Sequence, residues 1–191
     1  LKGHKTANID DYKDFDNNII LSNKAQPWFK HELYNQIPLT KELRDELEQF
    51  KSIGFFVAKD GEILWEHYWD GYSSKSHTNS FSMSKSVVTM LLGKAIEQGY
   101  IESLDQPITD FLPEFEDDEF GRNCTIGDLS AMTSGFDWKE DYYLPLNPTA
   151  KAYYGRNIEK QMLSRKFISE PGQRFNYISS DTQLLAIILQ R

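Results

Sequence analysis

The sequence predicts an α+β fold, with an antiparallel sheet near the start of the chain and a helical domain after it. Runs of β-branched and aromatic residues at 53–58 and 63–69 flank the dipeptide Asp60-Gly61, the strongest short-range signal of a β-hairpin. Beyond residue 73, apolar residues recur at helical spacing behind residues that favour helix caps. An isolated hairpin is marginal in water, so we expect it to pack against further strands or helices.

The chain before the hairpin divides into an irregular part and a helix. Residues 1–39 carry scattered charges without periodicity, and we expect an irregular N-terminal extension. Thr40 can cap a helix that runs to about Lys51, because its apolar residues fall on one face. Residues 40–72 are therefore predicted to be one helix and the hairpin.

Residues 73–191 are predicted to be mostly helical. The expected helices are 82–98 with Gly99 after its end, a short helix from 105 to 113, one capped by Thr125 and ending near Ser134-Gly135, one from Asn157 to Lys166, and a last helix with the capping box Ser180 and Gln183. The chain stops inside the apolar run 184–189. We hypothesise that these residues are a segment of a longer polypeptide.

Composition excludes several classes of function. The chain is 39% hydrophobic and 26% charged, which is typical of a globular protein. A net charge of −8 and a pI near 5.0 argue against a nucleic-acid surface, since phosphate contacts require clustered Lys and Arg. No run approaches the roughly 18 apolar residues of a membrane span. Cys124 is the only cysteine, which excludes an internal disulfide; no metal-ligand spacing occurs, and we expect neither metal nor cofactor.

A candidate nucleophile lies at the start of the predicted helix 82–98. Ser82-Met83-Ser84-Lys85 is the only S-x-x-K in the chain, and residues at i and i+3 are neighbours on one helix face. Ser82 could then act as a nucleophile with Lys85 as the base beside it. The alternative is a serine N-cap followed by a solvated lysine, which is the commoner reason for such a tetrapeptide.

Three segments together resemble a known superfamily. They are FSMSKSVVTMLLGKAIEQGYIESLDQPITDFLPEF at 81–115, TIGDLSAMTSGF at 125–136 and PGQRFNYISSDTQLLAIIL at 171–189. The set resembles the β-lactamase, DD-peptidase and carboxylesterase superfamily of penicillin-recognising serine hydrolases, and its class C branch in particular. The residues of these motifs are most similar to those of the 6-aminohexanoate-dimer hydrolase-like and esterase-like members of that branch. This similarity favours such members over enzymes of antibiotic resistance.

The resemblance implies a role for a second motif, Tyr177-Ile178-Ser179. Tyr177 would be the proton shuttle beside Ser82 and Lys85, and Ser179 would orient the substrate or Lys85. The alternative for Tyr177 is an aromatic residue buried before a helix.

The resemblance also implies what this sequence lacks. The third motif of the family, a K-T-G or H-x-G triplet on an edge strand, follows the helix that begins near Tyr177, and nothing after Arg191 is present. The expected fold is thus β-lactamase/transpeptidase-like with its C-terminal strands absent from this chain. The missing C-terminal segment of the same polypeptide would be its partner, and the isolated segment would turn over little or no substrate. Relatives of this kind also suggest an extracytoplasmic location.

The function expected from these residues is a serine hydrolase that acts on a small-molecule or peptide-like amide or ester through an acyl-enzyme. A different class remains open: a non-catalytic penicillin-recognising module that binds or senses a peptide. A third alternative is a purely structural domain.

Other candidate sites are weaker. The segment 137–143 is rich in aromatics and could face the substrate, with Trp138 as a binding residue, or could be an irregular surface connection. A Ser-His-Asp triad is not expected, because no G-x-S-x-G elbow occurs. Cys124 is interpreted as a small core residue, and the acidic run 114–119 as a solvated surface.

Overall fold

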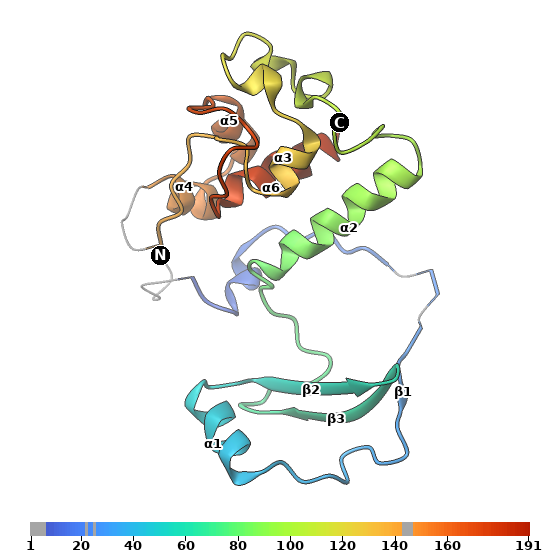
Figure 1. The fold of residues 1–191 in the computed structure, drawn as a ribbon. Helices are drawn as coiled ribbons and strands as arrows, with labels where there is room; N and C mark the ends of the chain where they lie inside the picture. Colours follow the sequence, from blue (N-terminus) through green and yellow to red (C-terminus); the bar gives the residue numbers. More distant parts are fainter. Residues whose placement is uncertain (1–6, 22, 25, 143–146) are drawn as a thin grey trace. The chain divides into compact units, whose positions relative to one another are not determined.

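The computed structural model describes residues 7–21, 23–24, 26–142 and 147–191. The chain divides into two compact units, Leu1–Asn79 and Ser80–Arg191, here called the N-terminal and the C-terminal unit (Figure 1). Each is considered by itself.

The N-terminal unit is built on a small sheet. Its elements are the 3-10 turn η1 (Asp11–Asp14), β1 (Phe29–Lys30), α1 (Lys41–Gln49), β2 (Gly54–Lys59) and β3 (Glu62–Tyr68). The strands lie in the order β1-β3-β2, with β2 antiparallel and β1 parallel to β3. The predicted hairpin is confirmed. Asp60 and Gly61 both have positive φ, +52° and +82°, as a two-residue turn between right-twisted strands requires.

The ends of α1 and the edge of the sheet follow from local polar contacts. The Thr40 side chain accepts a hydrogen bond from the Leu43 amide, so the predicted cap of α1 is confirmed. Asn35 bonds the backbone of Glu66 through both side-chain amide atoms, at 2.9 and 3.1 Å. Part of the segment expected to be irregular is therefore attached to β3.

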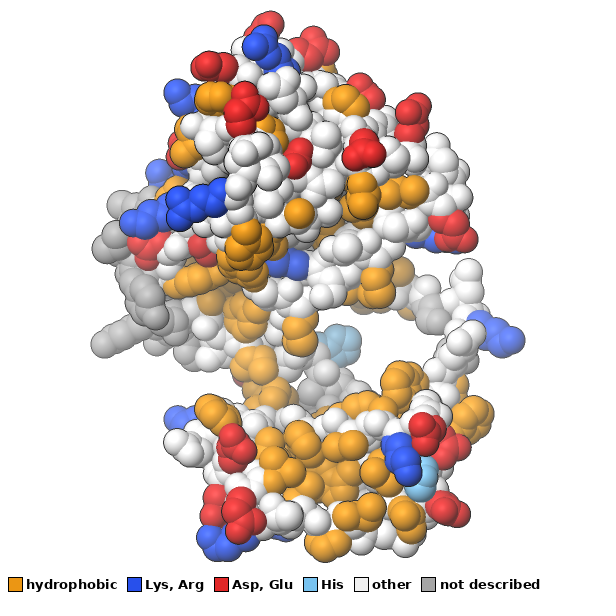
Figure 2. Space-filling model, in the orientation of Figure 1, with side chains coloured by type: hydrophobic (Ala, Val, Ile, Leu, Met, Phe, Trp, Pro, Cys, Tyr) orange, Lys and Arg blue, Asp and Glu red, His pale blue; other side chains and the backbone are white. Residues whose placement is uncertain are grey.

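The N-terminal unit has little interior of its own. Hydrophobic side chains gather on the surface over its sheet (Figure 2). Trp28 is 56% exposed, and its ring meets the ring of Phe56 edge-on at 5.7 Å. Among the residues described in this unit, no hydrophobic side chain is buried. The core of the described chain lies in the C-terminal unit.

The C-terminal unit is helical, as predicted. Its helices are α2 (Met83–Glu97), α3 (Ile126–Ser130), α4 (Pro148–Tyr154), α5 (Ile158–Leu163) and α6 (Ser179–Ile188), with 3-10 turns η2 (Ile108–Asp110), η3 (Pro113–Phe115) and η4 (Gly121–Asn123). Helix α6 is central, since α2, α3 and α5 all contact it (Figure 1). Four of its buried side chains are large aliphatic residues, Leu184, Leu185, Ile187 and Ile188. The hydrophobic effect on this helix therefore organises the unit.

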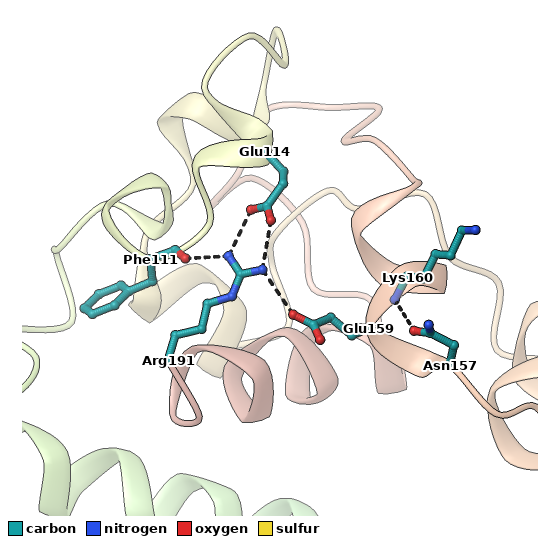
Figure 3. Close-up of polar contacts among 6 residues, drawn as sticks. All are labelled: Phe111, Glu114, Asn157, Glu159, Lys160 and Arg191. Atoms are coloured by element: carbon teal, nitrogen blue, oxygen red, sulfur yellow. Dashed lines mark hydrogen bonds and ion pairs between the residues drawn. The ribbon is translucent and has the colours of Figure 1, made fainter.

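Some predicted helix boundaries hold and others do not. The short helix predicted from 105 to 113 is wrong, because this stretch forms only the 3-10 turns η2 and η3 with Pro113 at the start of the second, and α5 ends before the predicted Lys166. Helix α2 matches the prediction, and Gly99 follows it with φ +75°. The capping box of Thr125 and Asp128 is present. The Asn157 side chain accepts from the Lys160 amide at the start of α5 (Figure 3). Helix α3 ends earlier than predicted, because Met132 turns the backbone to φ +56°.

The predicted capping box of the last helix is wrong. Helix α6 begins at Ser179, and Ser180 lies inside it, buried, with no hydrogen-bond partner for its hydroxyl among the residues described. The physical reason is that the Ser179 amide already has a partner elsewhere, the Glu140 carboxylate at 2.7 Å. A distant side chain thus supplies the cap that the local sequence was expected to supply.

The far end of α6 is held by Arg191. Its guanidinium forms a two-pronged pair with Glu114 at 2.8 and 3.0 Å and also donates to Glu159 and to the Phe111 carbonyl (Figure 3). These contacts join α6 to η3 and α5. Hydrogen bonding to Arg191 lowers the pKa of the Glu114 carboxyl.

Candidate active site

The start of α2 presents Ser82 and Lys85 to each other. Ser82 occupies the N-cap position, but its side chain makes no capping hydrogen bond, so its hydroxyl is available to other groups. Lys85 Nζ donates to Ser82 Oγ at 3.3 Å. The one-turn spacing predicted from the sequence therefore brings the two side chains into contact.

The residue before Ser82 has an unusual backbone. Phe81 has φ +45°, in the left-handed region that bulky L-residues avoid. Ser84 Oγ donates to the Phe81 carbonyl at 2.7 Å, and the Ser84 amide bonds the same oxygen. Strained residues of this kind cluster at functional sites.

The segment before α6 supplies the third group. Tyr177 OH donates to Ser82 Oγ at 2.9 Å, across 95 residues of sequence. Lys85 Nζ lies 5.3 Å from the centre of the Tyr177 ring. Ser82 Oγ is therefore in contact with a hydroxyl and an amine that could each carry its proton.

Ser179, two residues after Tyr177, contacts Lys85 directly. Lys85 Nζ donates to Ser179 Oγ at 3.0 Å. Lys85 thus bridges Ser82 and the first residue of α6.

Glu140 is a site residue that sequence reasoning missed. Its carboxylate accepts from the Ser179 amide at 2.7 Å, from Ser179 Oγ at 2.8 Å, from Trp138 Nε1 at 3.0 Å and from Tyr142 OH at 2.6 Å. The only signal in the sequence is that Glu140 lies two residues from two aromatic donors. Nothing in that pattern shows that the loop reaches Ser179.

Glu140 is ionised at neutral pH despite its burial. Burial acts to raise the pKa of this carboxyl, but hydrogen bonds from Tyr142, Ser179 and Trp138 outweigh it and leave the pKa below its ordinary value. Burial, together with its hydrogen bond to Glu140, raises the pKa of Tyr142 to about 12, so its phenol stays protonated. The site therefore contains one carboxylate, which is joined through Ser179 to Lys85.

The loop after α3 is bonded to α6. Gly135 has φ +73°, and a Cβ there would lie 2.3 Å from the Ser169 carbonyl oxygen, so only glycine fits. Ser134 is fully buried and donates to Asp181 Oδ1 at 2.7 Å. Phe136 packs edge-on against Phe167 at 5.0 Å. The loop is thus fixed both by apolar packing and by a buried hydrogen bond.

Asp181 is a buried carboxyl that forms no ion pair with a described residue. Its Oδ2 has no hydrogen-bond partner among the residues described. Burial raises its pKa to about 7, although the hydrogen bond from Ser134 acts in the opposite direction. Asp181 is therefore largely protonated below neutral pH.

Trp138 lies mostly in the core, at 5% exposure, and its indole N–H bonds Glu140. The Arg165 guanidinium lies over its ring, 5.2 Å from the centre. The ring also borders a pocket of about 260 Å³ whose lining includes Phe136, Arg174 and Asn176. In the rest of the predicted aromatic segment, Tyr142 faces Glu140, and Tyr143 lies outside the described residues.

The remaining candidates take structural places. Cys124 is fully buried, and burial raises the pKa of its thiol well above the usual range. In the acidic run, Asp118 accepts from the Gly121 and Phe167 amides, so it organises two loops. Within the described ranges no three His, Cys, Asp or Glu side chains gather in a way that could hold a metal ion. No described helix is long and apolar enough to cross a membrane.

Comparison with known proteins decides the family. A sequence profile described as Beta-lactamase matches residues 39–191, most of the chain. The chain belongs to the Beta-lactamase family. The family match covers both the hairpin and every residue placed at the site above, and the predicted family is confirmed.

Individual relatives in the Beta-lactamase superfamily agree with this assignment. A 6-aminohexanoate-dimer hydrolase from Paenarthrobacter ureafaciens is 26% identical over 160 residues, covering 78% of this chain and 40% of that protein. A solved Bacillus anthracis structure, assigned as a 6-aminohexanoate-dimer hydrolase, superposes with a TM-score of 0.66 at 21% identity, covering 78% of this chain and 42% of that one. A mutant class C β-lactamase has a TM-score of 0.55 at 18% identity, with the same coverage.

These likenesses confirm the predicted β-lactamase/transpeptidase-like fold. The chain spans about two fifths of the length of the relatives it matches. The structure brings Ser82, Lys85, Tyr177 and Ser179 together within hydrogen-bonding distance.

Proposed function

We propose that this chain carries the nucleophile and proton-transfer groups of a serine hydrolase that cleaves an amide or ester through an acyl-enzyme. The observation that carries the proposal is the contact of Ser82 Oγ with both Tyr177 OH and Lys85 Nζ, at 2.9 and 3.3 Å. A serine hydroxyl becomes a nucleophile when an adjacent group takes its proton. A plain N-cap serine would bond the amides of its own helix, and Ser82 does not.

The reaction begins with proton transfer. As Ser82 Oγ bonds to the carbonyl carbon, its proton passes to whichever of Tyr177 and Lys85 is deprotonated, and the carbonyl oxygen becomes an oxyanion. The Ser82 backbone N–H, at the positive end of α2, would supply one hydrogen bond to that oxyanion. The stored proton then passes to the leaving amine or alcohol as its bond to the carbon breaks.

Hydrolysis of the acyl-enzyme repeats the sequence with water. Water gives a proton to the same groups and attacks the acyl carbon, and the proton returns to Ser82 Oγ as the acid is released. Atoms and charges balance in both halves, so no cofactor is needed. The second oxyanion donor and the opposite wall of the site would come from a further segment of the same polypeptide, in line with the length of the relatives.

An open-chain amide is the substrate class best supported. The relative from Paenarthrobacter ureafaciens is named for hydrolysis of the dimer of 6-aminohexanoate, which is such an amide. An extracytoplasmic location, expected from the resemblance, remains part of the proposal.

The test is covalent labelling of the intact polypeptide that contains these residues with a fluorophosphonate probe. We expect labelling that Ser82→Ala abolishes and that Ser86→Ala, an exposed serine one turn further along α2, leaves unchanged. Hydrolysis of a linear amide should be lost with Ser82→Ala in parallel. Unchanged labelling of Ser82→Ala would contradict the proposal. Stable labelling without any hydrolysis would instead favour a binding or sensor module.

A further inference from the structure

We propose that Glu140 is a positioning residue for proton transfer at Ser82, because it holds Ser179 as a hydrogen-bond acceptor for the Lys85 ammonium. The inference rests on the proposed function and adds a residue to it. It begins from contacts that are all internal to the C-terminal unit.

The first step concerns the single proton of the Ser179 hydroxyl. Ser179 Oγ lies 2.8 Å from Glu140 Oε1 and 3.0 Å from Lys85 Nζ. An ionised carboxylate accepts hydrogen bonds and donates none, so Ser179 must give its proton to Glu140. Its lone pairs then face Lys85, which must be the donor in the second bond. This arrangement makes Lys85 the donor to Ser179 and gives the chain of hydrogen bonds a defined direction.

The Glu140 carboxylate is held in place by hydrogen bonds to both of its oxygens. Each carboxylate oxygen accepts two hydrogen bonds: Oε1 from Ser179 Oγ and Tyr142 OH, and Oε2 from the Ser179 amide and Trp138 Nε1. Trp138 is itself buried, so one of the donors is fixed by the core. Four bonds from three residues leave this side chain little freedom to rotate.

The third step concerns charge. The titratable or charged groups around the Glu140–Ser179 contact are Lys85 on α2, Tyr177 before α6, Tyr142 on the loop of Glu140 itself, and Arg165, which lies over the Trp138 ring. A neutral Gln at position 140 would remove the negative charge that favours the ammonium. Its NH₂ group could also donate to Ser179 Oγ and reverse the hydrogen bond. Lys85 would then lose Ser179 as its hydrogen-bond acceptor.

The experiment measures the rate of fluorophosphonate labelling of Ser82 in the intact polypeptide between about pH 6 and pH 10. The variants are Glu140→Gln, Ser179→Ala and the double variant. Glu97→Gln is the matched control, since Glu97 is an exposed α2 carboxylate paired with Lys94. Loss of a charged hydrogen bond predicts that Glu140→Gln labels about 10- to 100-fold more slowly. The alkaline fall in rate should begin at lower pH, and Glu97→Gln should follow the wild type.

The double variant tests whether Glu140 acts through Ser179. If it does, adding Glu140→Gln to Ser179→Ala slows labelling no further, because the coupled contact is already gone. Effects that multiply would overturn the inference, as would a wild-type rate or an unshifted pH profile for Glu140→Gln. Ser82→Ala distinguishes failure of the proposed function from failure of the inference about Glu140. If Ser82→Ala is still labelled, the proposed function is wrong. If Ser82→Ala is not labelled but Glu140→Gln is labelled at the wild-type rate, only the role of Glu140 is wrong.

Unfolding by denaturant guards against a trivial loss of structure, since Glu140 also caps α6. Tyr142→Phe, from the same loop, removes one donor but keeps the carboxylate charge. Tyr142→Phe should leave the alkaline fall of the labelling rate at the wild-type pH. A shift equal to that of Glu140→Gln would show that the effect comes from the order of the loop and not from the carboxylate charge. If Glu140→Gln does not fold, Ser179→Ala must itself move the alkaline fall of the labelling rate to lower pH for the inference to stand.

Discussion

Helices α2 and α6 both carry residues of the candidate site, but they are held in opposite ways. Of the ten residues of α6, six are buried, whereas only Leu92 is buried among the fifteen of α2. Met83 and Met90 on α2 are 70% and 68% exposed. Helix α2, which begins beside Ser82, thus has little buried surface, whereas α6, which follows Tyr177, is embedded in the core. Substitutions of site residues on α2 should therefore change the labelling rate more than the free energy of unfolding, and substitutions in α6 should change mainly the free energy of unfolding.

The largest expected effect is on the chemistry of α2. Lys85→Ala removes both a proton carrier and the positive charge beside Ser82, and we expect a loss of labelling rate of about 10⁴-fold. The free energy of unfolding should change by less than about 0.5 kcal/mol, because the side chain is not part of the core. Labelling kinetics and denaturant unfolding measure the two. A large loss of stability would break the contrast between the helices.

The next effect is the pH dependence that α6 brings through Asp181. Its pKa is raised to about 7 in the folded state against about 3.9 in the unfolded chain, so the folded state binds the extra proton between these values. The contribution of Asp181 to the free energy of unfolding is then fully present below about pH 4 and is lost as the pH rises through 7. The loss amounts to roughly 4 kcal/mol if this group acts alone.

Asp181→Asn keeps an acceptor for Ser134 and removes the ionisation. We expect its unfolding curve to flatten between pH 4 and 7 and its stability to exceed that of the wild type at pH 8. Denaturant unfolding across this range is the measurement. A slope identical to the wild type would assign the pH dependence to other groups.

The smallest effects compare apolar residues on the two helices in this 191-residue chain. Leu184 on α6 is fully buried, so Leu184→Ala should cost about 3 kcal/mol through lost burial and the cavity left behind. Met90→Ala on α2 should cost within about 0.5 kcal/mol. Equal costs would contradict the contrast. A larger cost of Met90→Ala in the intact polypeptide than here would show that further residues cover α2.

Local signals explain which parts of the fold could be predicted. The turn at Asp60-Gly61, the caps Thr40, Thr125 and Asn157, and the end of α2 at Gly99 depend on neighbouring residues and were found from the sequence. The parallel pairing of β1 was missed, because two residues carry no periodicity. The capping box at Ser180 failed because a tertiary contact replaced it.

The candidate site divides in the same way. Ser82 and Lys85 share one helical turn, so their contact follows from spacing, and Tyr177 was found through the resemblance of its motif. Glu140 could not be found, since its role exists only after the loop has folded onto Ser179. Trp138 was singled out as a substrate-binding residue, and the structure places its polar atom on Glu140.

The left-handed turn at Phe81 gives the middle serine of the S-x-x-K motif a purpose of its own. Ser84 donates two hydrogen bonds to the Phe81 carbonyl, from its amide and from its hydroxyl. These bonds stabilise a backbone conformation that costs on the order of 1 kcal/mol. We expect loss of these two hydrogen bonds to let the chain before Ser82 relax. Ser84 thus stabilises the backbone just before Ser82 through its bonds to Phe81.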